Sequence, residues 1–201
     1  CCLSVFCGHC EMCVSGRPAL CRNPDLRRRP GEPPKLTWNG TPLTQFANLG
    51  AYAEKMLVHE NAIVKIREDM PFGAAALIGC GVTTGVGAVL NTAKIEPGSS
   101  VVVFGCGGVG LAAIQGARIG GARMIIAVDT VESKLATAKE LGATHVVDAS
   151  AGDPVKAIRE LTGGGVEYSF EAIGLKRAAE QAFECLAPGG TATVIGMIPV
   201  G

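Results

Sequence analysis

Hydrophobic and polar positions along the second half of the chain predict strands that alternate with helices. Apolar runs of strand length lie at Val101–Phe104, Met124–Val128, His145–Asp148, Val166–Ile173 and Thr191–Ile195. Helix-like segments separate them, running to about Ile119 and then over Val131–Leu141, Asp153–Leu161 and Lys176–Leu186. Apolar strands that alternate with helices favour a parallel sheet covered on both faces, an α/β fold of the doubly wound, Rossmann-like kind.

The first third of the chain has a different pattern. A polar, Pro-rich stretch at Arg22–Asn48 predicts a long surface loop, with a hairpin around Trp38-Asn39-Gly40 and a solvated basic run at Arg27–Arg29. Two segments, Leu49–Val58 and Ala62–Ile66, show the alternation typical of short strands in an all-β module.

A helix is predicted from Phe72, because Pro71 is well suited to a helix start. It leads into the glycine-rich segment Gly79–Gly85, and a second helical run follows to about Ala93.

Composition and charge narrow the range of partners. The 201 residues carry no net charge, so nothing indicates nucleic acid or an acidic membrane surface as a partner. Met70–Ala93 and Ser99–Ala117 lack charged residues, but both are rich in glycine and the first also contains threonines and an asparagine, which favours a buried core over a membrane span. No signal peptide is visible, so we expect a cytoplasmic protein.

The stretch Ser99–Asp129 carries the clearest ligand signal. The turn Gly105-Cys106-Gly107-Gly108-Val109-Gly110 joins a strand to a helix, and Asp129 ends the next strand. In such a turn, Gly105 permits the tight bend, Gly107 lets a pyrophosphate approach the backbone, and Gly110 allows close packing of helix and strand. The helix N-terminus attracts phosphate, and the carboxylate of Asp129 would bind ribose hydroxyls and repel a 2′-phosphate. The sequence therefore predicts an NAD site; the alternative is a glycine-rich turn in an unrelated α/β protein.

Cysteines form the second signal. Four of the nine, Cys7, Cys10, Cys13 and Cys21, make a C-x2-C-x2-C-x7-C motif with turn residues between them. Four thiolates complete the shell of a tetrahedral zinc ion and leave no open position, so a structural zinc site is predicted. An iron–sulfur cluster and two disulfides remain as alternatives. Cys80 lies between two glycines, where an isolated cysteine is more often a small core residue.

Together these features resemble the zinc-containing medium-chain alcohol dehydrogenases over essentially the whole chain. The resemblance rests on the four-cysteine motif, the GCGVTTG segment at Gly79–Gly85, the glycine turn, and the pair Asp129 and Lys134. The GCGVTTG form is similar to the alcohol, glutathione-dependent formaldehyde and aryl-alcohol dehydrogenase branch.

The resemblance implies a role for each matching residue. The four clustered cysteines would hold the structural zinc, and Cys80 would be one of three protein ligands of a catalytic zinc. Thr84 and Val109 would press the nicotinamide towards the substrate, and Asp129 and Lys134 would bind the adenosine ribose. The remaining cofactor-binding positions it implies are the glycines of the turn, Gly105, Gly107, Gly108 and Gly110, and the strand-end residues Ile173 and Ile195.

The resemblance also implies an architecture and an activity. Residues 1–78 would be part of a GroES-like, mainly β catalytic domain with the zinc lobe at 1–25, and residues 79–201 an NAD-binding domain incomplete at its C-terminus. The intact family transfers a hydride from a small-molecule alcohol to NAD⁺ and forms homodimers or homotetramers. The other catalytic-zinc ligands of the family lie upstream of this sequence, so we expect a fragment that is inactive alone.

Two other functions remain open from the sequence. A non-catalytic NAD-binding module would need the glycine turn but no catalytic zinc. A zinc-free quinone reductase relative would usually lack both Cys80 and the four-cysteine motif, so these cysteines argue against it.

Overall fold

The computed structural model describes residues 1–26, 29, 31–45 and 49–199. The chain divides into two compact units, Cys1–Phe72 and Gly73–Gly201, so the division falls a few residues before the predicted domain boundary at 78. Most of the predicted basic run at Arg27–Arg29 lies outside the described residues, as does part of the predicted loop around it.

The first unit consists of short elements. They are α1 (Glu11–Val14), the 3₁₀ turns η1 (Pro18–Leu20), η2 (Pro24–Leu26) and η4 (Glu60–Ala62), and strands β1 (Thr37–Trp38) and β2 (Thr41–Pro42). The hairpin prediction is confirmed, because β1 and β2 pair antiparallel around Asn39 and Gly40, both with the positive φ that a type I′ turn requires.

The strands predicted at Leu49–Val58 and Ala62–Ile66 are wrong. No described residue of either segment is in a strand, and most of their side chains are exposed. An alternating pattern forms a strand only where a neighbouring strand pairs with it, and the described residues provide none here. Among the described residues of this unit only Ala62 is buried, so apolar packing contributes little to its stability.

One continuous helix begins at Phe72, the last residue of the first unit, and ends at Ala93 in the second. Its parts are α2 (Phe72–Leu77), the π-helical η5 (Ile78–Val82), α3 (Thr83–Gly87) and the π-helical η6 (Ala88–Ala93). The glycine-rich segment expected to separate two helical runs therefore lies within the helix. By length and composition alone this helix is long and apolar enough to cross a membrane, a property that it shares with core helices of soluble proteins. The sequence predicts that this stretch is buried, but only residues in the C-terminal half of the helix are buried: Gly85, Ala88 and Val89.

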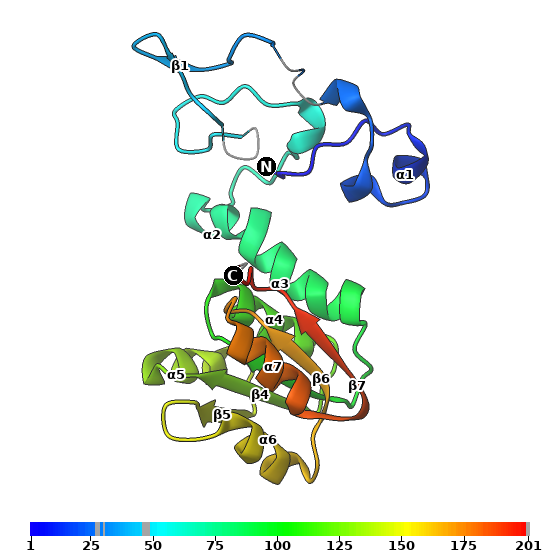
Figure 1. The fold of residues 1–201 in the computed structure, drawn as a ribbon, viewed down its shortest axis with the longest axis vertical. Coiled ribbons are helices and arrows are strands. Elements are labelled where there is room, and N and C mark those ends of the chain that lie inside the picture. Colours follow the sequence, from blue (N-terminus) through cyan, green and yellow to red (C-terminus); the bar gives the residue numbers. More distant parts are fainter. Residues whose placement is uncertain (27–28, 30, 46–48, 200–201) are drawn as a thin grey trace. The chain divides into compact units, whose positions relative to one another are not determined.

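A five-stranded parallel sheet follows, as the sequence predicts (Figure 1). Its strands are β3 (Ser100–Phe104), β4 (Met124–Asp129), β5 (His145–Asp148), β6 (Val166–Glu171) and β7 (Leu186–Val194), in the order β5-β4-β3-β6-β7. The turn expected at Pro188-Gly189-Gly190 is wrong: it lies inside β7, where a register shift against β6 absorbs the irregular backbone.

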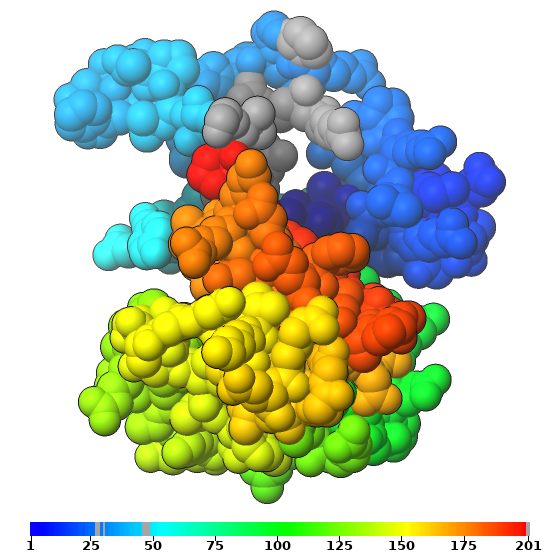
Figure 2. Space-filling view, turned by 60° about the horizontal axis from the view of Figure 1, so that its bottom comes forward, coloured from blue at the N-terminus to red at the C-terminus, as the bar shows by residue number. Residues whose placement is uncertain are grey.

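Helices cover both faces of this sheet. They are α4 (Gly108–Ile119), α5 (Glu132–Leu141), α6 (Pro154–Thr162) and α7 (Lys176–Glu184). Alternate residues of β3 point to opposite sides: Val101 and Val103 pack with α4, α5 and η6, whereas Val102 and Phe104 pack with α6 and α7. Figure 2 shows α6 and α7 side by side in yellow and orange. The doubly wound α/β prediction is confirmed.

The start of the sheet depends on one carboxylate. Oε2 of Glu167 accepts hydrogen bonds from the backbone N–H and the hydroxyl of buried Ser100, at 2.6 and 2.8 Å. The Ser100 N–H is the main reason why the pKa of Glu167 is lowered. A lowered pKa means that the ionised carboxylate stabilises the fold above its unfolded pKa and that this contribution is lost as pH falls through the folded pKa.

We expect Glu167→Gln to lower the free energy of unfolding at pH 7 by about 1 kcal/mol, a figure reduced because the side chain is exposed. The difference from the unmodified chain should shrink as pH falls below about 4.3. Urea unfolding at pH 7 and at pH 3.5 measures both values, with the exposed Glu160→Gln as control. An equal difference at both pH values would contradict the role of the charge.

Candidate functional site

The glycine turn lies at the carboxyl edge of the sheet, between β3 and α4. A β-carbon placed on Gly107 or Gly108 would have nothing within 4 Å, so the space before the helix is open. A β-carbon on Gly110 would instead overlap the carbonyl oxygen of Gly105. No side chain caps this helix, so its first N–H groups are available to a phosphate. The geometry fits the division of roles that the sequence predicts for the three glycines.

Asp129 is held rigidly beside this turn. Its Oδ2 accepts the N–H of Cys106 at 2.8 Å, and its Oδ1 accepts the N–H groups of Thr130 and Val131 at 2.8 and 3.1 Å. Lys134 Nζ lies 3.9 Å from Oδ2. Because the backbone fixes both oxygens, the carboxylate is oriented before any ligand arrives.

A cleft of about 670 Å³ runs along this edge, which is within the usual size range of ligand pockets. Five of the predicted cofactor residues line it: Gly105, Gly107, Asp129, Lys134 and Ile173. The sequence analysis missed other lining residues, among them Thr130, Leu175, Arg177 and Gln181. Their only sequence signal is position: Thr130 directly follows β4, Leu175 directly precedes α7, and Arg177 and Gln181 lie in α7.

The remaining predicted cofactor residues are not among those that line this cleft: Thr84, Gly108, Val109, Gly110 and Ile195. The α3 helix, which carries Thr84, packs on α4 at the turn that carries Val109: a β-carbon on Gly85 would overlap the Val109 carbonyl oxygen. Ile195 is half-buried, packs against the core, and donates its N–H to the Glu171 carbonyl oxygen at 2.8 Å. The structure therefore brings the GCGVTTG segment and the glycine turn into contact.

Cys80 is exposed on η5. Among the described residues, no group of three or more potential metal ligands includes it. Three protein ligands are the usual minimum for a catalytic zinc, so the side chains described here do not by themselves form that site.

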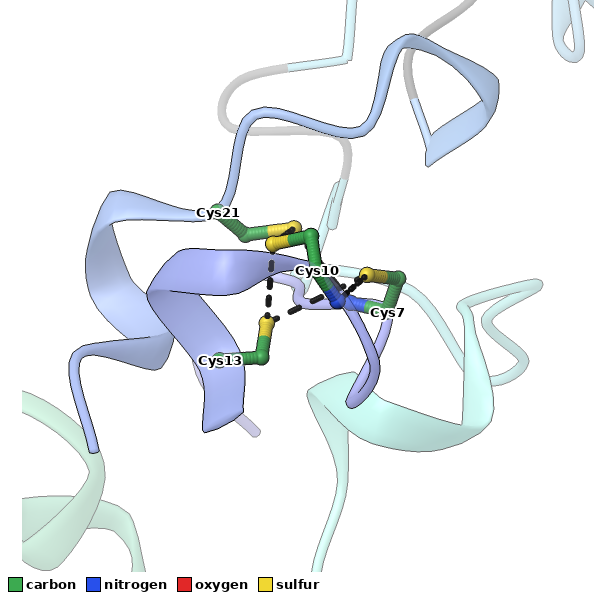
Figure 3. Close-up of side chains that lie close together, drawn as sticks. All are labelled: Cys7, Cys10, Cys13 and Cys21. Atoms are coloured by element: carbon green, nitrogen blue, oxygen red, sulfur yellow. Dashed lines mark hydrogen bonds between the residues drawn. The ribbon is translucent and has the colours of Figure 1, made fainter. Parts of the chain in front are cut away.

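The four other predicted ligands do converge (Figure 3). Cys7 lies on the loop before α1, Cys10 caps the start of that helix, Cys13 lies within it, and Cys21 follows η1. All four sulfur atoms lie within 4.8 Å of one another, with Cys13 Sγ 3.9 Å from Cys7 Sγ and 3.5 Å from Cys10 Sγ. Zn–S bonds of about 2.3 Å in a tetrahedron place sulfur atoms roughly 3.8 Å apart. The cluster therefore fits one zinc ion.

These distances argue against both alternatives. A disulfide would bring two sulfur atoms to about 2.05 Å, and all nine cysteines are free. An iron–sulfur cluster would need room for several iron and sulfide atoms between the thiolates.

Backbone groups prepare the cluster for a cation. The N–H groups of Arg22 and Cys13 lower the pKa of Cys10 to about 6, and the His9 N–H lowers the pKa of Cys7. Burial, with some help from the neighbouring thiols, raises the pKa of Cys13 to about 11. The Cys10 thiolate thus forms at neutral pH, and a metal ion would displace the protons that remain on the other thiols.

A parallel sheet with an open glycine turn beside an oriented aspartate is the arrangement typical of dinucleotide-binding α/β proteins. The family model described as zinc-binding dehydrogenase matches residues 108–201. The S-(hydroxymethyl)glutathione dehydrogenase of Synechocystis sp. is 41% identical over 97% of this chain and 55% of its own length. The alcohol dehydrogenase class-3 of Oryza sativa subsp. japonica is 38% identical over 100% of this chain and 55% of its own.

Solved structures give the same picture. An alcohol dehydrogenase zinc-binding domain protein from Burkholderia ambifaria has a TM-score of 0.85 at 40% identity, covering 98% of this chain and 56% of its own. The benzyl alcohol dehydrogenase of Acinetobacter calcoaceticus has a TM-score of 0.84 at 39% identity, covering 98% and 55%. Over nearly its whole length, the chain is therefore similar to zinc-binding alcohol dehydrogenases. It spans about 55% of the length of the curated relatives it matches.

Proposed function

We propose that this chain is the NAD-binding part of a zinc-dependent alcohol dehydrogenase and also carries its structural zinc lobe. The observation that carries the proposal is the open space at Gly107, directly before the uncapped N-terminus of α4 and beside the oriented Asp129. The bound nicotinamide would accept a hydride from a small-molecule alcohol. A non-catalytic NAD module and a zinc-free quinone reductase explain less, because neither accounts for the four-cysteine zinc cluster.

In this proposal, the chain's own residues bind and orient the dinucleotide. The N–H groups of the first turn of α4 would hold the pyrophosphate, and Asp129 and Lys134 would hold the adenosine ribose. Thr84 and Val109 would press against the nicotinamide, since the contact of α3 with α4 joins their segments. Fixing the ring in this way favours the hydride transfer by orientation. Cys80 would supply one ligand to a catalytic zinc whose other ligands are not among the described residues.

Several wider properties belong to the same proposal. We place residues 1–78 in a GroES-like catalytic domain and residues 79–201 in the NAD-binding domain. The complete gene product would act on alcohols or aldehydes as a homodimer or homotetramer. Nine free cysteines suit the reducing cytoplasm. Formation of NADH by the complete gene product, given NAD⁺ and a panel of alcohols, tests the activity.

The dinucleotide site can be tested on this chain with two glycine variants. We expect Gly107→Ala to leave the melting temperature nearly unchanged, because its β-carbon meets no atom, and to weaken NADH binding by about tenfold. We expect Gly110→Ala to lower stability by about 1–3 kcal/mol or more, because its β-carbon overlaps the Gly105 carbonyl oxygen. NADH fluorescence titration and thermal unfolding measure the two effects. Unchanged NADH affinity in folded Gly107→Ala would contradict a pyrophosphate at this turn.

A further inference from the structure

Glu171, the last residue of β6, is an unusual buried acid. Its side chain has no exposed surface, and it belongs to no ion pair in the part of the chain that the structure describes. A buried carboxylate without a cation is costly unless hydrogen bonds satisfy it. The hydrogen bonds that it makes therefore indicate what it does.

This residue joins the segments that follow two strands at the carboxyl edge of the sheet. Its Oε1 accepts the N–H groups of Ile173 and Gly174, at 2.8 and 2.6 Å, just after β6. Its backbone carbonyl oxygen accepts the N–H groups of Ile195 and Gly196, at 2.8 and 3.2 Å, just after β7. Ligands of doubly wound sheets bind at this edge, so Glu171 supports the region where a dinucleotide would lie.

The second carboxylate oxygen has a different environment. Oε2 of Glu171 is buried and has no hydrogen-bond partner. A β-carbon on Gly196 would lie 2.6 Å from it and would also overlap the N–H of Gly174, so glycine backbone fills the space beside it. Since Oε2 pairs with nothing, the contribution of Glu171 comes from Oε1.

The turn held by Oε1 forms part of the cleft wall. Ile173 lines the cleft with 48% of its surface exposed. A β-carbon on Gly105 would lie 2.5 Å from Ile173 Cγ1, so this side chain packs directly against the glycine turn. Without an acceptor at Oε1, the backbone of Ile173 would lose one of its fixed points, and the cleft wall would move relative to the glycine turn.

We propose that Glu171 is a positioning residue of the dinucleotide site, which rests on the proposed function. It holds Ile173 against the glycine turn by accepting two backbone hydrogen bonds, and its negative charge is not required. A neutral side chain of the same shape and with one acceptor oxygen should therefore replace it, whereas an apolar side chain of similar volume should not.

The experiment compares NADH affinity in the full chain and three variants, at a temperature where circular dichroism shows each to be folded. Glu171→Leu leaves two N–H groups without an acceptor and should weaken NADH binding at least tenfold. Glu171→Gln keeps an acceptor at Oε1, so its NADH affinity should stay within about threefold of that of the unmodified chain. Ser169 lies on the same strand as Glu171 and donates a buried hydrogen bond to the carbonyl oxygen of Ala182 in α7, so Ser169→Ala should lower stability but not NADH affinity.

The outcomes separate this proposal from the proposed function. If the unmodified chain binds no NADH, both proposals fail. If it binds NADH and folded Glu171→Leu binds equally well, or folded Glu171→Gln loses binding, only the positioning role is overturned. If Glu171→Leu does not fold, the Ile173→Ala variant tests the positioning role instead. The Ile173 side chain is half-exposed, so this variant should fold and should bind NADH about fivefold more weakly. Unchanged affinity in that variant would overturn the role.

Discussion

The variant Cys10→Ser is expected to purify with almost no zinc, whereas the unmodified chain should hold about one zinc ion. Cys10 Sγ lies 3.5 Å from Cys13 Sγ and 3.8 Å from Cys21 Sγ, and its pKa is lowered to about 6, so it is a well-prepared thiolate ligand. A serine hydroxyl does not ionise at neutral pH and cannot replace it.

The loss of zinc should also disorder the surrounding lobe. Among the described residues of Cys1–Phe72 only Ala62 is buried, so there is little apolar core to hold this unit once the metal has left. Structural zinc binding contributes on the order of 10 kcal/mol in small domains, far more than that core can. We therefore expect rapid proteolysis of the unit in Cys10→Ser or after a strong chelator.

Elemental analysis after gel filtration and limited proteolysis measure these two effects. Cys80→Ser is the matched control, because Cys80 is an exposed thiol outside the cluster, and it should keep both the zinc and the protease resistance. An unmodified chain that holds no metal, with nine thiols that titrate freely, would refute the structural zinc site.

Replacement of Asp129 with Ala is expected to weaken NADH binding by about 100-fold, since two hydrogen bonds from ribose hydroxyls to a charged acceptor would be lost. The carboxylate also fixes the N–H groups of Cys106, Thr130 and Val131, so the turn itself should loosen. NADPH binding should weaken much less, because the repulsion between the carboxylate and the 2′-phosphate disappears together with the hydrogen bonds. Selectivity for NADH over NADPH should therefore fall at least tenfold.

Parallel titrations with NADH and NADPH measure this selectivity. Glu132→Ala removes the same charge from the start of α5 without changing the lining of the cleft, so it is the matched control and should retain the selectivity. Unchanged discrimination in Asp129→Ala would count against a ribose at this carboxylate.

Much of the fold follows from local patterns that the sequence carries openly. The apolar runs at Val101–Phe104 and Met124–Val128 predict their strands almost to the residue, because a strand buried on both faces needs unbroken hydrophobic character. The four-cysteine motif needs only tight turns to bring its sulfur atoms together. Both signals depend on interactions within or between neighbouring segments, so the sequence alone reveals them.

Other features depend on contacts between distant segments. The alternation at Leu49–Val58 indicates a strand, but a strand requires a partner, and none pairs with it among the described residues. Gly79–Gly85 suggests a break in the helix, yet it stays helical because Gly85 allows α3 to pack closely on α4. In both cases, tertiary packing overrides local propensity.

The sequence by itself determined the parallel sheet, the glycine turn with its aspartate, and the four-cysteine cluster, because each is a pattern of residue types at fixed spacing. Only the tertiary structure decided which residues line the cleft, and it alone showed Glu171 to be a buried acceptor that joins the ends of β6 and β7. The physical reason is that strand order places residues far apart in sequence at one edge of the sheet. Hydrogen bonds across that edge leave no periodic signal in the sequence.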